Sequence, residues 1–294
     1  MKNSDSLILS IDAGGTSLKA GLILNEELVK DSFMSLPIDS AGSKTSISET
    51  FCRLGEAASR KAREAGLGIR AAAVCIPGPF DYKKGCSLMT HKYKNIYGLP
   101  LGPFICKGMG REIPVKFMHD STAFLLGSVT RQNLAHHSRV CGVIIGTGLG
   151  FASMIDGKIL ESSSGGPGIS IFSRPYLQKT AEDYVSKRGI IQQFHASSVL
   201  LSDKKDVKDI ADAARGGDTA AADVFAQTGV HLGKILRPIL EEWHFTLLIL
   251  GGAISKSSDL FLPGLRNELA DLPAEIVSCP NIDTAPLLGA ARNL

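Results

Sequence analysis

The sequence predicts a mixed α/β protein. Short apolar runs at Leu7–Ile11 and Ala71–Ile76 are typical of buried strands, and an amphipathic segment at Ser46–Ala65 lies between them. A strand, a glycine-rich turn and a second strand occur together twice, at Leu7–Leu24 and at Val140–Ile155. The length of 294 residues allows one large domain or two of ordinary size.

The first of these strand pairs opens the chain. The strand ends at Asp12, a turn forms on Gly14 and Gly15, and apolar sequence then resumes. Glycine lets backbone N–H groups approach an anion because no Cβ stands in the way. Thr16 and Lys19 add a hydroxyl group and a cation, and the Asp12 carboxylate can anchor a hydrated Mg²⁺. The pattern predicts a site for nucleotide phosphates; an ordinary hairpin is the open alternative.

A helix and a strand follow. The helix is predicted at Ser46–Ala65, with Ser46 and Glu49 as a capping box and Gly66 as its end. The strand at Ala71–Ile76 stops at a Pro-Gly-Pro sequence. This order of strand, helix and strand indicates an α/β layer.

The next elements surround Asp120. A loop-like stretch at Thr90–Pro103 precedes a short strand at Val115–Met118 and a helix at Ala123–Val129. Asp120 therefore lies at a strand end, at or near a helix N-cap. A carboxylate there could accept the proton of a substrate hydroxyl, and a plain N-cap is the alternative.

The second strand pair repeats the plan of the first. Val140–Ile145 stops at Gly146–Gly150, and Phe151–Ile155 continues into an Asp-Gly hairpin turn and Lys158–Leu160. The repetition indicates an internal duplication in which two glycine turns hold one polyphosphate; two unrelated hairpins are the alternative. Thr147 belongs to this second turn.

The rest of the chain continues the alternation of helices and strands. A third strand at Thr246–Leu250 ends at Gly251-Gly252, which suits close approach of a base and ribose, although a plain strand-to-helix connection is equally open. The other predicted elements are a serine- and glycine-rich loop at Ser162–Ser173, helices at Lys179–Arg188, Asp206–Arg215, Asp218–Trp243, Ser258–Ala270 and Pro286–Arg292, and a strand at Glu275–Ser278.

Composition excludes several classes of protein. A formal charge of +3 with scattered basic residues argues against nucleic acid as a partner. The six cysteines include no C-x-x-C pair, so neither a zinc site nor a disulfide framework is expected. No signal peptide precedes Asp12, and the longest apolar run, Phe245–Leu250, is too short for a bilayer. A cytoplasmic protein that is not membrane-bound is expected.

Five motifs in order resemble the ROK family of sugar kinases, from the actin-like ATPase superfamily. They are DAGGTSLKAGL, PGP, HDSTAFLLG, IGTGLG and LILGGAIS, and the resemblance covers Leu7–Ala291. It implies a two-domain actin-like (ribonuclease H-like) α/β fold with an interdomain cleft. The smaller domain would be 1–119, with the terminal helix 284–294 packed back on it, and the larger 120–283. ATP would bind across the cleft, with a sugar near its base.

The resemblance also implies roles for individual residues. Asp120 matches the catalytic aspartate. Sugar contacts are implied for Gly78, Asn95 and Glu182, and nucleotide contacts for Asp12, Gly14, Gly15, Thr16, Lys19, Thr147, Gly148, Gly251 and Gly252. From the residues alone, Glu182 could be a solvated surface carboxylate, Lys19 an outward-facing strand residue, and Asn95 a stabiliser of its own turn.

The chain departs from the family pattern in three places. His119 precedes Asp120 where the family usually has asparagine; it could replace a sugar contact or be a packed histidine. The family's zinc motif has no counterpart, because Gly165–Lys179 contains neither cysteine nor histidine. Gly166–Ser170 also lacks the glutamate and histidine that contact sugar in the family. A zinc-free protein is expected.

The expected function is phosphoryl transfer from ATP to a hydroxyl of a hexose or hexose derivative, as in a glucokinase-like ROK kinase. Asp120 would accept the proton, and Mg²⁺ held near Asp12 through water would neutralise the phosphates. The alternatives are a sugar- and nucleotide-binding sensor that has lost catalysis and an ATPase acting on a protein partner. A repressor is set aside because the first strand begins at Leu7, which leaves no room for a helix-turn-helix. A homodimer is expected by analogy.

Overall fold

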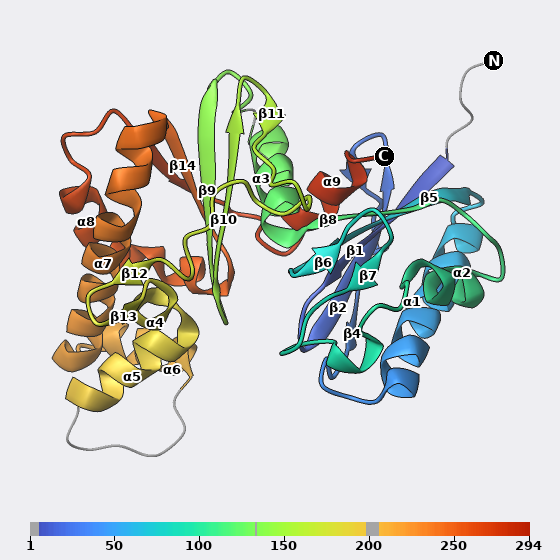
Figure 1. Cartoon of the computed structure of the whole chain (residues 1–294), viewed down its shortest axis with the longest axis horizontal. Helices are drawn as coiled ribbons and strands as arrows, with labels where there is room; N and C mark the ends of the chain where they lie inside the picture. Colours follow the sequence, from blue (N-terminus) through green and yellow to red (C-terminus); the bar gives the residue numbers. More distant parts are fainter. Residues whose placement is uncertain (1–5, 133, 198–205) are drawn as a thin grey trace. The chain divides into compact units, whose positions relative to one another are not determined.

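The computed structural model describes residues 6–132, 134–197 and 206–294. The chain forms two compact units (Figure 1). The first unit comprises Met1–Leu134, Glu161–Pro167 and Asp283–Leu294, and the second comprises Ala135–Leu160 and Gly168–Ile282. Each unit contains a mixed sheet and helices, so the predicted α/β class is confirmed.

The sheet of the first unit has the strand order β3-β2-β1-β5-β8, with β4 also on β2. The antiparallel pair β1 and β2 is the predicted hairpin, and β5 and β8 continue the sheet parallel to β1. A separate small ribbon is formed by β6 and β7. The bounds are β1 Ser6–Ala13, β2 Ser17–Leu24, β3 Glu27–Leu28, β4 Met34–Pro37, β5 Gly68–Ile76, β6 Phe80–Asp81, β7 Cys86–Ser87 and β8 Val115–His119.

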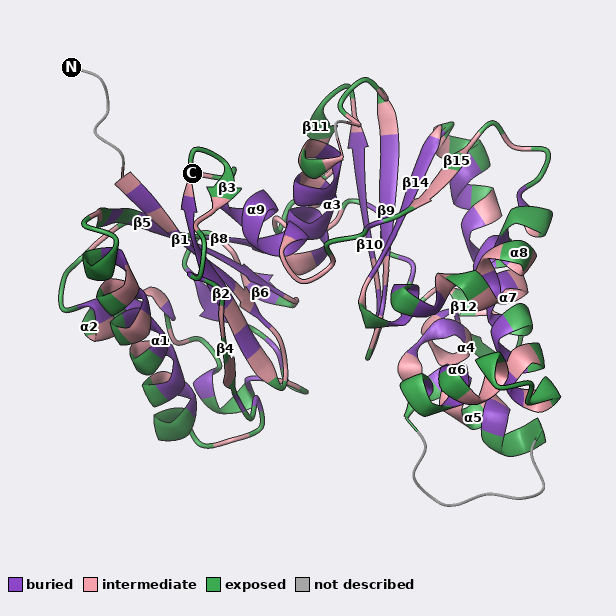
Figure 2. Ribbon diagram, turned by 180° about the vertical axis from the view of Figure 1, so that it is seen from behind, coloured by how far each residue is buried: buried purple, intermediate pink, exposed green. Residues whose placement is uncertain are grey.

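Alternate residues of β1 face opposite sides of this sheet, as a strand requires. Leu7, Leu9 and Ile11 join one buried cluster with α1 (Lys44–Glu64), on which α2 (Gly102–Met109) packs. Ser10 faces the other side, where its hydroxyl donates to the carbonyl of Leu287 at 2.6 Å on α9 (Ala285–Ala291). The strands β1, β2 and β5 are therefore covered on both faces and buried along most of their length (Figure 2).

Two glycines bring α3 (Asp120–Arg131) against α9. A Cβ on Gly127 would lie 1.8 Å from the carbonyl oxygen of Ala285, and a Cβ on Gly289 would lie 1.8 Å from that of Ala123. The two backbones touch, so α3 is fastened to the helix that packs on β1 and β5. This packing explains why α3 belongs to the first compact unit. The predicted limit between the two domains lay before Asp120, at the start of α3. The predicted domains, 1–119 with 284–294 and 120–283, stay a prediction.

The sheet of the second unit repeats the plan of the first. Its order is β11-β10-β9-β14-β15, with an antiparallel pair β9 and β10 and two further strands parallel to β9. The repetition of the strand plan predicted from the two glycine turns is therefore confirmed, and an internal duplication whose turns hold one polyphosphate stays a prediction. The bounds are β9 Arg139–Ile145, β10 Leu149–Ile155, β11 Lys158–Ile159, β14 Leu247–Gly251 and β15 Glu275–Ser278.

The helices of the second unit form one cluster with its sheet. Cys141, Val143 and Ile145 of β9 share a buried core with residues of these helices. The predicted helix starts at Asp206 and Asp218 are confirmed, since Asp206 is the N-cap of α6 and Asp218 is the N-cap of the long α7. The bounds are α4 Glu182–Val185, α5 Lys187–Ser197, α6 Val207–Arg215, α7 Thr219–Trp243, the 3-10 helix η2 Ala253–Ser257 and α8 Ser258–Glu268.

Two local predictions were wrong. The N-cap of α1 is Ser43, whose hydroxyl accepts the N–H of Ser46 at 3.2 Å, so Ser46 and Glu49 form no capping box there. Ser43 has the extended backbone that an N-cap needs, one turn before the predicted start.

The segment Lys179–Arg188 is also not one helix. It holds β13 (Lys179–Thr180), which pairs with β12 (Pro175–Tyr176), then α4 and the start of α5. The Thr90–Pro103 stretch contains the 3-10 helix η1 (Lys94–Ile96) and the first two residues of α2. Among the described residues, no helix has both the length and the apolar character needed to cross a membrane.

Candidate functional site

The candidate site of the first unit lies where its parallel strands end. Because β1, β5 and β8 are parallel, their carboxyl ends meet at one edge of the sheet. Asp12 pairs with Cys75 there, and Ile76 pairs with His119. Asp120 follows as the first residue of α3. Open α/β sheets bind ligands at this edge.

Asp12 is a half-buried carboxylate next to other negative charge. Burial raises its pKa from 3.8 to about 6, with a further contribution from Asp120, while Lys19 acts in the opposite direction. The thiol of Cys75 lies 3.7 Å from its Oδ1 and donates to it. A carboxylate that resists ionisation for these reasons would be stabilised by a cation, which fits the predicted role of Asp12 as an anchor for hydrated Mg²⁺.

Asp120 is held by the residues on either side. Its Oδ1 lies 2.8 Å from Nδ1 of His119 and accepts the N–H of Ser121 at 2.7 Å. Burial alone would raise the pKa of Asp120, but His119, Ser121 and the charge of Lys92 hold it below its usual value. The carboxylate is therefore ionised at neutral pH and can accept a proton, although it is a weak base.

His119 belongs to the same network. It is the N-cap of α3, and its Nδ1 lies 2.8 Å from the Ser121 hydroxyl and 3.2 Å from the Ser121 amide nitrogen. When Nδ1 carries a proton it can donate to Asp120; without one it accepts from Ser121. The predicted sugar contact of His119 stays a prediction, because the structure shows this nitrogen directed to Asp120 and to the helix end.

The glycine turn of the first unit is held by its carbonyl groups. Gly14 accepts the hydroxyl of Tyr93 at 2.5 Å, and Gly15 accepts the N–H of Ser40 at 3.1 Å. Within the described part of the chain, the N–H groups of Gly15 and Thr16 donate no hydrogen bond. Adjacent N–H donors without protein partners are what an anion-binding turn offers.

Lys19 is the one cation beside this turn that the sequence pointed to. Its Nζ forms an ion pair with Asp283 at 2.5 Å, just before α9. Its side chain is 32% exposed, so Lys19 is neither free nor simply turned to solvent. Its charge is balanced by Asp283, and its contact with phosphate stays a prediction.

The two predicted sugar residues of the first unit lie in different surroundings. A Cβ on Gly78 would be 3.4 Å from the Tyr82 hydroxyl and 3.7 Å from Cδ2 of His119, so Gly78 lies beside the Asp120 network. The amide of Asn95 instead donates to the carbonyls of Ala41 at 3.1 Å and Gly42 at 2.8 Å. Asn95 thus ties η1 to the loop before α1, and its sugar contact remains a prediction.

In the second unit, Glu182 lies on the glycine turn between β9 and β10. Its Oε2 accepts the N–H of Leu149 at 2.9 Å and lies 2.7 Å from the position of a Cβ on Gly148. Glu182 is therefore not a solvated surface carboxylate. The N–H groups of Thr147 and Gly148 donate no hydrogen bond to any described residue, as in the first turn.

The second glycine motif of this unit adjoins the first. Gly251 ends β14 opposite Ile144, and Gly252 has a φ of 82°, in the left-handed region that favours glycine. A Cβ on Gly252 would be 2.3 Å from the carbonyl oxygen of Ile145, the residue before the turn. The structure therefore brings Thr147, Gly148, Gly251 and Gly252 to one edge of the second sheet.

The segment before Glu182 is held by aromatic packing. The hydroxyl of Tyr176 lies 2.9 Å from Nδ1 of His231, and the Tyr184 ring lies 5.3 Å from Tyr176 and 5.1 Å from His231. Burial, with a smaller effect of Lys234, lowers the pKa of His231 and favours its neutral form.

Within residues 6–132, 134–197 and 206–294, no group of three or more histidine, cysteine or carboxylate side chains is arranged to hold a metal ion.

Several residues of the site gave no signal in the sequence. Tyr82, Tyr93 and Lys92 belong to loops, and Asp283 contacts Lys19 from the far end of the chain.

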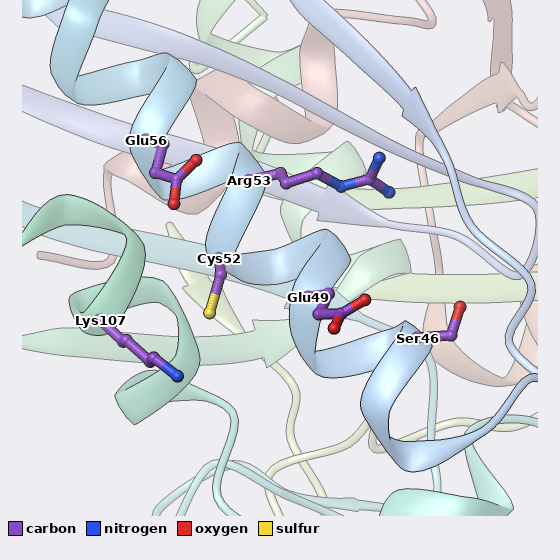
Figure 3. A pocket seen from close by; sticks show the side chains of 6 residues that line it. All are labelled: Ser46, Glu49, Cys52, Arg53, Glu56 and Lys107. Carbon is purple, nitrogen blue, oxygen red and sulfur yellow. The ribbon is translucent and has the colours of Figure 1, made fainter.

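A separate pocket of about 450 Å³ lies between α1 and α2 and contains none of the predicted site residues (Figure 3). It is lined by Ser46, Glu49, Cys52, Arg53, Glu56 and Lys107.

Solved structures share this fold across the whole chain. A ROK family glucokinase from Streptomyces griseus, in complex with glucose and AMPPNP, is 22% identical and has a TM-score of 0.80, covering 98% of this chain and 99% of that one. A ROK hexokinase from Thermus thermophilus is also 22% identical, has a TM-score of 0.71, and covers 97% and 96%. The chain therefore has the two-domain α/β fold of these structures.

Sequence comparison identifies the family. The family model described as "ROK family" matches residues 8–170, and the chain belongs to the ROK family. A glucokinase from Thermotoga maritima is 23% identical over 97% of this chain and 96% of its own length. The DNA-binding transcriptional repressor Mlc of Escherichia coli is 22% identical over 70% of this chain and 54% of its own length.

Proposed function

We propose that the protein is an ATP-dependent kinase that phosphorylates a hydroxyl group of a hexose or hexose derivative. The observation that carries this proposal is the ionised carboxylate of Asp120 at the same sheet edge as Asp12, which lies two residues before Gly14 of the Gly14–Thr16 turn. Membership of the ROK family and the likeness to a glucokinase from Thermotoga maritima support it.

Asp120 is the proposed proton acceptor. As the sugar oxygen forms its bond to the γ-phosphorus, the bond from that phosphorus to the leaving ADP oxygen breaks and the hydroxyl proton passes to Asp120. A carboxylate with a lowered pKa is a weak base, which suffices when the transition state is loose and the proton leaves late. Positioning and charge stabilisation then supply most of the rate enhancement.

Backbone donors and Asp12 are proposed to hold the nucleotide. The N–H groups of Gly15 and Thr16, and those of Thr147 and Gly148, would donate to phosphate oxygens. When bound, Mg²⁺ would neutralise phosphate charge, with Asp12 as its anchor through water. Gly14, Lys19, Gly251 and Gly252 complete the proposed nucleotide set, in which Lys19 acts together with Asp283.

The sugar set consists of Gly78, Asn95, His119 and Glu182. Gly78 and His119 lie beside Asp120, which supports their inclusion. The Glu182 carboxylate also holds the turn at Leu149, so its removal would disturb that turn as well as any sugar contact. A sugar, rather than nucleic acid, is the proposed partner, and a homodimer in the cytoplasm is the proposed form.

A sensor that binds nucleotide and sugar without turnover is the second candidate. It is favoured by the absence of Glu and His from Gly166–Ser170 and by the similarity to the repressor Mlc. ADP formation with Mg-ATP, measured across hexoses, amino sugars and N-acetyl sugars with a blank lacking sugar, separates the candidates. The kinase predicts turnover with at least one sugar, the sensor predicts nucleotide binding without turnover, and an ATPase would show turnover in the blank.

A further inference from the structure

The side chain of Lys92 lies across the glycine turn of the first unit. A Cβ on Gly15 would be 3.6 Å from Cε and 3.7 Å from Cδ of Lys92, and 3.4 Å from the Ser40 hydroxyl. These distances place the aliphatic part of Lys92 against the backbone of the turn. A Cβ at this position would be in ordinary van der Waals contact with these atoms.

The position of Lys92 is fixed by its neighbour. Tyr93 is fully buried, its hydroxyl donates to Gly14 at 2.5 Å, and its N–H donates to Ser40 at 2.7 Å. Tyr93 also has a left-handed backbone, with a φ of 51°, and therefore turns the chain directly after Lys92. The turn and the lysine are fastened to each other through one side chain and one backbone hydrogen bond.

The charge of Lys92 acts on Asp120 and is not neutralised by an ion pair within the described residues. Lys92 is half-buried, and its charge contributes to the low pKa of the Asp120 carboxyl. Within the described residues, its Nζ forms no hydrogen bond and no ion pair, whereas Lys19 is paired with Asp283 at 2.5 Å. Of the two lysines beside the turn, Lys92 is the one whose charge is not balanced by an ion-pair partner.

We propose that Lys92, rather than Lys19, is the cation that binds the transferred phosphoryl group. The inference rests on the proposed kinase function and adds a catalytic residue to it. The aliphatic part of Lys92 lies against the Gly14–Thr16 turn, and its charge helps to lower the pKa of Asp120. In the proposed complex its ammonium group lies between the donor phosphate at the turn and the acceptor hydroxyl at Asp120. Its ammonium N–H groups donate to oxygens of the phosphoryl group while the bond to the leaving oxygen breaks and the bond to the sugar oxygen forms.

The test compares three variants in the whole protein. Lys92→Met removes the charge and keeps the length, Lys92→Arg keeps the charge, and Lys94→Met is the matched control because Lys94 is exposed two residues further on. Lys92→Met is expected to lower kcat about 100-fold with little change in the sugar KM, as for loss of one donor to a developing anion. Lys92→Arg is expected to recover part of that loss, and Lys94→Met to behave as wild type.

A binding measurement keeps the proposal independent of turnover. Calorimetric titration of inorganic tripolyphosphate, with EDTA present, is expected to give about tenfold weaker binding in Lys92→Met than in wild type. Wild type that phosphorylates no sugar would count against the kinase alone, and the tripolyphosphate titration would still decide the role of Lys92. Equal tripolyphosphate binding in wild type and Lys92→Met, or a kcat within threefold of wild type, overturns the proposal. If Lys92→Met does not fold by circular dichroism, Lys92→Gln takes its place under the same criteria.

Discussion

Replacing Asp12 with asparagine should stabilise the protein at neutral and alkaline pH. The pKa of Asp12 is raised from 3.8 to about 6, so the folded state binds a proton that the unfolded state has lost over this interval. Stability is therefore lost as pH rises from 3.8 to 6. The pKa of Asp12 differs between the folded and unfolded states by about two units. At about 1.36 kcal/mol for each unit, ionisation of Asp12 lowers the free energy of unfolding by about 3 kcal/mol. Asp12→Asn removes the ionisable group and should recover this free energy above pH 6.

The size of the effect should follow pH. With these pKa values, linkage gives a gain of about 3 kcal/mol at pH 8 and about 1.6 kcal/mol at pH 5. Urea unfolding followed by circular dichroism, with EDTA present, measures both. Asp223→Asn is the matched control, since Asp223 is exposed on α7. A variant that is less stable than wild type at pH 8, or a gain independent of pH, would refute the reasoning.

Two further predictions concern the helix crossing and the second turn. Gly127→Ala should destabilise the protein by about 3 kcal/mol, at the upper end for overpacking, because the new Cβ would meet the carbonyl of Ala285; Gly68→Ala, with open space around it, is the control in urea unfolding. If Gly127→Ala hardly changed the free energy of unfolding, α3 and α9 could move apart at little cost. Glu182→Gln should retain the bond from the N–H of Leu149, whereas Glu182→Ala should cost about 1–3 kcal/mol by the same assay. Equal stability of these two variants would show that the bond contributes nothing.

The backbone plan of each sheet could be predicted from the sequence because it depends on local patterns. Apolar runs of strand length, interrupted by glycine turns, gave both hairpins and the repetition between them. The helix starts at Asp206 and Asp218 were predicted for the same reason, since an N-cap depends on its own few neighbours. Ser43 was missed because Ser46, three residues later, fits the same motif.

The contacts around the site could not be predicted because they join distant parts of the chain. Lys19 meets Asp283 only after α9 has packed on the sheet, and Tyr93 meets Gly14 only after its loop has returned to the turn. Both depend on packing that no sequence window contains. The hydrogen bond of Glu182 to Leu149 is of the same kind, and it turns an apparently exposed carboxylate into part of the glycine turn.

The most direct test of the proposed function is detection of the product itself. Wild type, Asp120→Asn and Asp223→Asn are incubated with Mg-ATP and the sugar that supports the fastest ADP formation, and the sugar phosphate is quantified by ³¹P NMR. Wild type and Asp223→Asn are expected to form sugar phosphate at equal rates. Asp120→Asn, with its fold verified by circular dichroism, is expected to be slower by about 10²–10⁴-fold. Sugar phosphate formed by Asp120→Asn at the wild-type rate, or none formed by wild type with any sugar, would contradict the account.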